Sequence, residues 1–219
     1  MENVSENKIK FITYLPKDIW MIFILAIGLN IARIVVFDSM YFVYILWNIF
    51  LAILPFVVSS LLSFQENIGK LSKPVFIFGS IIWILLLPNA PYIVTDFIHL
   101  GKGHGAPVLY DAFLLFSSAW LGLILFMYSL RDIENIIRIK YGNTIANIKV
   151  PSIILLVSVG IYIGRYLRFN SWDVFTDPSF FGNTWQTLTH PIHFNEALIF
   201  VLPCFFFLYV IYTAWKKRV

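Results

Sequence analysis

An aspartate and a histidine stand three residues apart, just after two prolines that interrupt an apolar stretch. The prolines are Pro88 and Pro91, and the polar pair is Asp96 and His99. If the segment after Pro91 is helical, the two polar side chains share one face. A carboxylate beside an imidazole can act as a general base with its orienting partner, or as two metal ligands. Both residues are therefore candidates for catalysis and for metal binding, with a polar pair on a membrane-surface helix as the alternative.

Two arginines have the same spacing at the end of a later apolar run. Arg165 stands about 21 Å of helical rise beyond Pro151, which would leave it inside the outer leaflet. An arginine at that depth needs a carboxylate, carbonyls or a phosphate. Arg168 can instead extend to the membrane surface. We expect the two arginines to hold an anionic group, and the carboxylates that could pair with Arg165 are those of Asp96, Asp111 and Asp173.

Further polar residues near these pairs complete the candidate site. Asp173 joins Asp96 and His99 as a candidate catalytic residue, and the candidate substrate-binding residues are Asn89, Arg165, Arg168, Asn170 and Trp172. Imidazole and carboxylate groups suit zinc or another divalent ion. The single cysteine, Cys204, excludes a cysteine-based metal cluster. The candidate metal ligands are Asp96, His99, His190 and His193.

The elements that must position these residues are membrane-spanning helices. The 219 residues are 59% hydrophobic and 13% charged, whereas soluble domains carry about a quarter charged residues. We predict an all-α integral membrane protein with one six-helix domain over residues 20–215, between a cytoplasmic segment (1–19) and a basic tail (216–219). Pro74 and Pro151 stand where helices are expected to begin, and the third helix is expected to be broken at Pro88-Asn-Ala-Pro91. The six apolar runs are Trp20–Phe37, Tyr41–Leu62, Pro74–Leu87, Val108–Leu130, Pro151–Leu167 and Ala197–Trp215.

Basic residues predict the orientation of the six runs. They gather at the N-terminus, in the second and fourth connections and in the tail, so the positive-inside rule places both termini in the cytoplasm. All four histidines then fall on the outer side. Three acidic residues of the inner connections are expected to be ordinary solvated charges: Glu66, Asp132 and Glu134.

Two stretches of this chain resemble the DUF1361 family of predicted bacterial membrane proteins. They are Trp83–Leu100, which contains Leu87-Pro-Asn-Ala-Pro-Tyr92, Thr95-Asp96 and His99-Leu100, and Gly164–Asp173, which contains Gly164-Arg165-Tyr-Leu-Arg168-Phe-Asn170-Ser171-Trp172-Asp173. The resemblance covers nearly the whole chain. It implies a multi-pass protein of the bacterial inner membrane without an assigned activity, so it carries over no catalytic role.

The resulting hypothesis is an outward-facing polar site that binds an anionic or lipid-linked substrate at the outer leaflet, with hydrolysis or transfer of that substrate as the activity that the same site could support. The lipid bilayer is the expected surrounding, and nucleic acid is not an expected partner. One alternative is a small transporter or channel subunit in which the proline-broken helix gates or binds substrate. The other is a non-catalytic scaffold whose outer segments dock a partner. The mostly apolar inner halves of the runs argue against the transporter.

Overall fold

The described part of the chain is helical. The structure is a computed structural model that describes residues 17–102, 105–168 and 173–218, and no β-strand occurs among them. Six stretches are long and apolar enough to cross a membrane, the third running from Lys73 to His99. The chain is thus a multi-pass, all-α membrane protein, as its composition predicts. The elements are α2 (Lys17–Phe37), α3 (Val43–Asn67), α4 (Lys73–Leu86), α5 (Asn89–Tyr92), the 3₁₀-helix η1 (Ile93–His99), α6 (Val108–Tyr141), α7 (Asn143–Tyr162), the π-helix η2 (Ile163–Leu167), α8 (Asp173–Thr176), α9 (Ser179–Thr189) and α10 (Pro191–Lys216).

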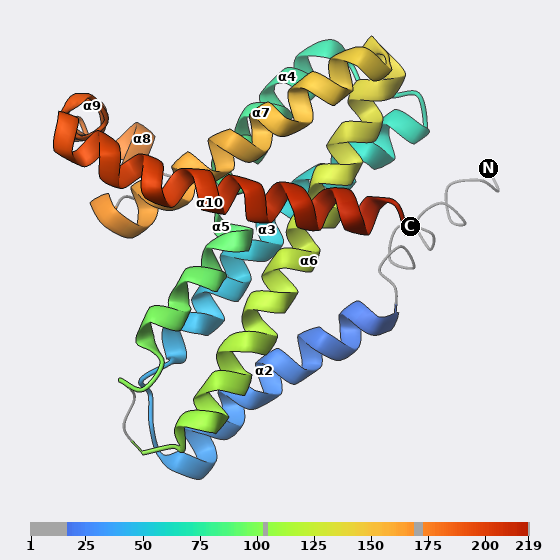
Figure 1. Cartoon of the computed structure of the whole chain (residues 1–219). Helices are drawn as coiled ribbons and strands as arrows, with labels where there is room; N and C mark the ends of the chain where they lie inside the picture. Colours follow the sequence, from blue (N-terminus) through green and yellow to red (C-terminus); the bar gives the residue numbers. More distant parts are fainter. Residues whose placement is uncertain (1–16, 103–104, 169–172, 219) are drawn as a thin grey trace.

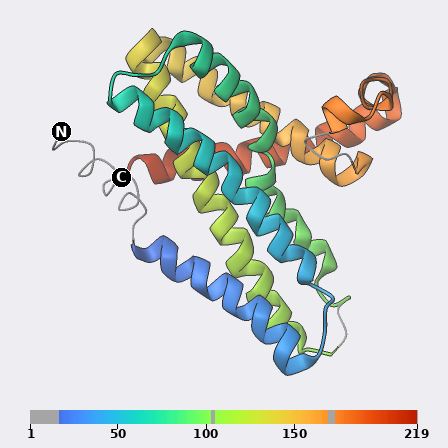
Figure 2. The ribbon, with the colours of Figure 1, turned by 180° about the vertical axis from the view of Figure 1, so that it is seen from behind.

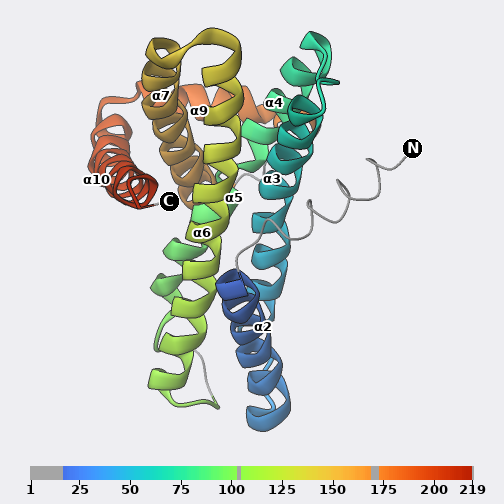
Figure 3. The same ribbon diagram turned by 90° about the vertical axis from the view of Figure 1, so that its right-hand side faces the viewer.

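Helix α6 is the central element of the bundle. It is the most buried of the six spans, and α2, α3, α5, η1 and α7 all pack against it. Figures 1 and 2 show α6 running through the molecule with α2 diverging from α3 on one side. The view in Figure 3 shows α10 beside α7, away from α2. The short turn between α2 and α3 therefore connects two helices that both pack on α6.

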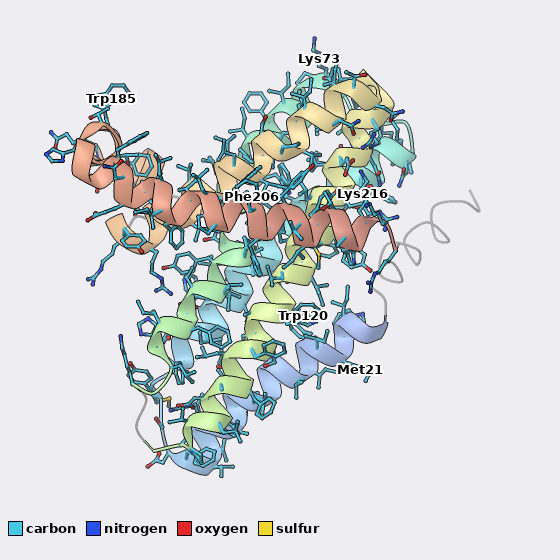
Figure 4. All side chains as sticks on the ribbon, in the orientation of Figure 1. Met21, Lys73, Trp120, Trp185, Phe206 and Lys216 are labelled. Atoms are coloured by element: carbon cyan, nitrogen blue, oxygen red, sulfur yellow. The ribbon has the colours of Figure 1, made fainter. Side chains whose placement is uncertain are left out.

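Large apolar side chains cover the outside of the bundle. Met21 on α2, Trp120 on α6 and Phe206 on α10 are exposed and extend away from the ribbon (Figure 4). Soluble monomers rarely expose large contiguous apolar patches. Lipid hydrocarbon is the solvent that such a surface fits.

The helix ends that carry basic residues lie together at one end of the bundle. Lys140 near the end of α6 pairs with Glu66 near the end of α3 at 2.7 Å. Lys216 at the end of α10 pairs with Glu134 of α6. These contacts bring together the chain segments that the positive-inside rule assigns to one side of the membrane.

The inner acidic residues of α6 do not behave as the sequence suggested. Helix α6 continues past Leu130 to Tyr141, so Asp132 and Glu134 are helical. Only 2% of Glu134 is exposed, and its carboxylate accepts hydrogen bonds from Arg138, Lys216 and Tyr212. Asp132 accepts hydrogen bonds from Ser59 and Ser60 of α3, each at 3.2 Å. The expectation of solvated charges was wrong because neighbouring helices supply donors that replace water.

Helix α7 begins earlier than its proline predicts. Its first residue is Asn143, and Pro151 lies inside the helix. Arg138 of α6 donates hydrogen bonds to the side chains of Asn143 (2.8 Å) and Asn147 (2.9 Å). These bonds anchor the additional first turns of α7 directly against α6.

The Pro88-Asn-Ala-Pro91 segment is seated between two glycines of neighbouring helices. A Cβ atom on Gly122 of α6 would lie 2.2 Å from the carbonyl oxygen of Ala90, and one on Gly160 of α7 would lie 2.6 Å from Cγ of Pro88. Such separations are possible only without a side chain. Gly122 and Gly160 thus let α6 and α7 approach this segment closely.

The backbone remains helical in dihedral angle across the segment while its hydrogen bonds change. Leu87 and Pro88 both have right-handed helical angles. Pro91 cannot donate to the Leu87 carbonyl, which instead accepts from the Ala90 N–H at 3.2 Å. The Asn89 side chain donates to the Leu86 carbonyl at 3.0 Å. Asn89 thus satisfies a backbone acceptor that the irregular helix would otherwise leave unpaired.

Replacing Gly122 with alanine is expected to destabilise the protein by about 1–3 kcal/mol, because the added methyl group meets backbone that cannot move independently. Gly160→Ala should cost less, since the clash is with a proline ring atom. Gly28→Ala is the matched control, because nothing lies within 4 Å of its new methyl group. Equilibrium unfolding in mixed micelles measures all three, and equal stability of Gly122→Ala and Gly28→Ala would contradict the close packing.

Candidate functional site around Asp96 and Arg165

The two main stretches identified in the sequence meet at an ion pair between a buried aspartate and a partly exposed arginine. Arg165 Nη2 lies 2.8 Å from Asp96 Oδ1, with 17% of the arginine side chain and 2% of the aspartate side chain exposed. The second aspartate oxygen, Oδ2, accepts a hydrogen bond from Asn48 Nδ2 at 2.8 Å. Arg165 Nε also donates to Thr95 Oγ1 at 3.0 Å. The partner of Arg165 is therefore Asp96, one of the three carboxylates that the sequence left open.

The side chains of the pair lie on two irregular helical segments. Asp96 and Thr95 lie on the 3₁₀-helix η1, which follows directly after α5. Arg165 lies on the π-helical turn η2, a rare feature that occurs often at functional sites. The Arg165 guanidinium also lies 4.9 Å from the ring centroid of Tyr92. A cation over an aromatic face is stabilised by the ring quadrupole, so Tyr92 and Asp96 together hold the guanidinium in one place.

His99 lies beside a tyrosine that the sequence did not indicate. The rings of His99 and Tyr44 are 5.6 Å apart in an edge-to-face arrangement. The Tyr44 hydroxyl is buried and has no hydrogen-bond partner within the described residues. It also lies within electrostatic reach of Asp96 and Arg165. A buried hydroxyl without a partner is costly, so Tyr44 is a candidate donor to a ligand.

Among the described residues, the other predicted site residues make no hydrogen bond or ion pair with Asp96 or Arg165, and some predicted site residues lie outside the description. Arg168 is exposed and has a left-handed φ of 58° at the end of η2. Asp173 begins α8, and His190 is exposed at the start of α10. Asn170, Trp172 and the side chain of His193 lie outside the described residues. Among the side chains that are described, no three from histidine, cysteine, aspartate or glutamate could hold a metal ion together, so metal binding stays a prediction.

A second buried ion pair joins α2 to α6. Arg33 Nε and Nη2 contact the two oxygens of Asp111 at 2.7 and 3.1 Å, and each side chain is 1% exposed. Arg33 Nη1 donates to Ser39 Oγ at 2.5 Å, and the guanidinium lies 4.7 Å from the ring centroid of Phe42. Asp111, a possible partner for Arg165 in the sequence, is thus used to fix the first helix.

Sequence reasoning missed several residues that build the two ion pairs. Asn48 and Arg33 are polar residues inside apolar runs. A polar residue at such a position usually needs a buried partner, so this feature could have identified both as candidates. Tyr44, Tyr92 and Thr95 gave no comparable signal, because tyrosine and threonine are ordinary residues of membrane helices. Their roles follow only from the packing of α3, α5 and η1.

An apolar cavity of about 320 Å³ lies next to the ion pair. It is lined by residues of α5, η1, α7 and α10, and Figure 1 shows α10 crossing the other three elements. Thr95, which accepts the hydrogen bond from Arg165, is part of its wall. The full lining is Pro91, Val94, Thr95, Ile161, Ile199, Phe200, Pro203, Cys204, Phe207 and Leu208.

The comparison with known proteins agrees with the resemblance seen in the sequence. The model of a family described as "Protein of unknown function (DUF1361)" matches residues 47–211. The match begins inside α3 and ends inside α10, so it includes every residue of the Asp96–Arg165 pair and its partner Asn48, while Arg33 of α2 precedes it. No curated protein and no solved structure matches the chain. The chain belongs to the DUF1361 family of proteins of unknown function.

Proposed function

We propose that the Asp96–Arg165 site binds an anionic group of the phosphate type at the outer leaflet of the cell membrane. The observation that carries this proposal is the arrangement of the Arg165 guanidinium. Its Nε and Nη2 contact Thr95 and Asp96, and within the described residues its Nη1 makes no hydrogen bond. A guanidinium has five N–H donors in a fixed fork that matches phosphate. An edge of the fork is therefore available to a ligand while Asp96 holds the other.

In this proposal the residues have distinct roles. Asp96 is a positioning residue, since both of its oxygens already accept hydrogen bonds from Arg165 and Asn48. Tyr44 donates its buried hydroxyl to the bound group. If the site also hydrolyses or transfers its ligand, His99 is the proton acceptor beside Tyr44, because no hydrogen bond to Asp96 or any other described side chain occupies its ring.

The proposal includes the orientation of the protein and a discontinuity in its third span. Both termini are cytoplasmic, supported by the basic residues at the ends of α6 and α10 and by Lys70 and Lys73 between α3 and the body of α4. The Pro88-Asn-Ala-Pro91 segment acts as a discontinuity that lets η1 present Asp96 and Thr95 at the site. A membrane-impermeant maleimide applied to intact cells should label a Lys102→Cys variant, and labelling only after lysis would contradict this orientation.

Arg165→Lys is expected to weaken the binding of inorganic phosphate by roughly ten- to a hundredfold, because a charge-assisted hydrogen bond contributes about 1.5–3 kcal/mol. Lysine keeps the charge and can still pair with Asp96, but it lacks the fork. Titration of the full-length protein in nanodiscs, followed by phosphorus NMR, measures the affinity.

Lys102→Gln is the matched control for that titration. Lys102 is an exposed cation in the loop after η1, so its loss removes a charge but no fork. Phosphate affinity that Arg165→Lys leaves unchanged, or that Lys102→Gln reduces equally, would contradict the proposed site. A scaffold without a ligand site would show no saturable binding that depends on Arg165.

A specific observation also supports the transporter alternative. Polar contacts continue into the inner half of the bundle, where Trp83 donates to Ser129 (2.8 Å) and Ser129 to the Pro55 carbonyl (3.0 Å). Asp132 and Glu134 follow on α6. Phosphate uptake into proteoliposomes that is lost in Asp132→Asn would favour transport, and binding without uptake would favour a site confined to the outer leaflet.

A further inference from the structure

We propose that the cavity between α5, η1, α7 and α10 holds the hydrocarbon chain of a single-chain anionic lipid whose headgroup is bound by Arg165. This inference rests on the proposed function and names the class of its ligand. The ligand would enter from the bilayer, with its chain in the cavity and its phosphate-type group at the guanidinium.

The walls of the cavity suit a hydrocarbon chain and no polar ligand. Only Thr95 and Cys204 among its lining residues carry a polar side-chain atom, and the Thr95 hydroxyl is already hydrogen-bonded to Arg165 and to the Tyr92 carbonyl. A buried polar ligand would lose its hydrogen bonds to water without replacement. An alkyl chain loses none.

The cavity opens sideways toward lipid. Ile199 and Phe207 of α10 line it and are 76% and 46% exposed, whereas Ile161 and Leu208 are buried at its back. The surface around this opening is the apolar surface of a membrane span. A chain can thus pass from the bilayer into the cavity without crossing water.

Prolines in two elements shape the space. Pro91 of α5 and Pro203 of α10 both line the cavity. Each removes a backbone hydrogen bond from its helix, which loosens and bends the helix there. The two prolines thus line the same cavity, one from each helix, at positions that carry no backbone N–H.

A hydrogen bond connects the wall of the cavity to the anion site. Thr95 belongs to the wall and accepts from Arg165 Nε, and Arg165 stands one turn beyond the lining residue Ile161. The lining residues of α10, Ile199 to Leu208, span about 13 Å of helical rise. A ligand that fills this length with hydrocarbon therefore carries its headgroup to Arg165, where a positive charge favours an anion.

The test uses dodecyl phosphate carrying a diazirine near the end of its chain, with the full-length protein in phosphatidylcholine nanodiscs. Photolabelling should be saturable and confined to peptides that contain the cavity residues of α5, η1, α7 and α10. Unlabelled dodecyl phosphate at ten times its Kd should reduce that labelling by about tenfold. Non-saturable labelling spread over exposed residues outside the cavity, such as Met21 and Trp120, would overturn the inference.

A variant that fills the cavity gives an independent readout. Val94→Phe places a larger side chain in the cavity and should abolish saturable labelling. Leu202→Phe is its matched control, because Leu202 is exposed on α10 outside the lining and should leave labelling unchanged. If Val94→Phe does not fold, Cys204→Leu fills the space with a smaller increase in volume. Saturable labelling that persists in a folded cavity-filling variant would overturn the inference.

Competition separates failure of this inference from failure of the proposed anion site. If dodecyl phosphate binds with an affinity that Arg165→Lys weakens, but its chain labels other surfaces, the anion site stands and the cavity assignment is overturned. If dodecanol competes as well as dodecyl phosphate and Arg165→Lys changes nothing, the cavity holds chains and the anion site is overturned. Competition by dodecyl phosphate alone, weakened by Arg165→Lys, supports both.

Discussion

Asp111→Ala should lower the free energy of unfolding by about 3–5 kcal/mol, because it leaves a buried guanidinium without its carboxylate. Arg33 and Asp111 are each 1% exposed and contact each other through two nitrogen–oxygen pairs. At this burial water cannot replace the lost carboxylate, so we expect α2 to detach from α6. Equilibrium unfolding by titration with sodium dodecyl sulfate in mixed micelles measures the loss.

The double variant Arg33→Leu/Asp111→Leu tests the cause of that loss. Replacing a whole buried ion pair by apolar residues is often neutral or stabilising, so the double variant should be more stable than Asp111→Ala. Ser39→Ala removes the hydroxyl that accepts a hydrogen bond from Arg33 Nη1, and losing that bond should cost about 1 kcal/mol. A loss below about 1 kcal/mol for Asp111→Ala would mean that the pair contributes no more than a surface ion pair.

Asp96→Ala should lower the free energy of unfolding by about 3 kcal/mol, at the lower end of the range for broken buried pairs, because Arg165 is partly exposed. It removes at once the acceptor for Arg165 and the acceptor for Asn48. The same variant should weaken phosphate binding, since the guanidinium loses the group that orients it. Unfolding in mixed micelles and phosphate titration of the folded fraction measure the two effects.

A double-mutant cycle isolates the contribution of this pair. Combining Asp96→Ala with Arg165→Met should show a coupling energy of about 0.5–3 kcal/mol, the range for residues in contact. Thr95→Val is the control for the loss of a neutral hydrogen bond to Arg165. It removes the hydroxyl that Arg165 contacts, but it keeps the size of the side chain and leaves the ion pair intact. Additive losses from Asp96→Ala and Arg165→Met would show that the two charges act independently.

Much of the fold could be predicted from residue types along the chain. Apolar runs of membrane-spanning length predicted six helices, because the bilayer interior tolerates few charges and leaves no backbone group unpaired. The helix ends could not be predicted as well. Polar and charged residues made the fourth apolar run end at Leu130 and the fifth begin at Pro151. Helix α6 instead continues to Tyr141, and α7 begins at Asn143. Their extensions are held by Glu134, Arg138 and Asn147, which pair with one another or with other helices.

The candidate site, too, could be predicted from the sequence only in part. Residue type and spacing were enough to single out Asp96, His99 and Arg165, since charged or imidazole side chains at membrane depth need partners. Which carboxylate pairs with which arginine was decided by the tertiary structure, which joins Arg165 to Asp96 and Arg33 to Asp111 across 69 and 78 residues of sequence. The physical reason is that ion pairs and hydrogen bonds act over about 3 Å, and only the packing of the helices brings groups so far apart in sequence within that distance.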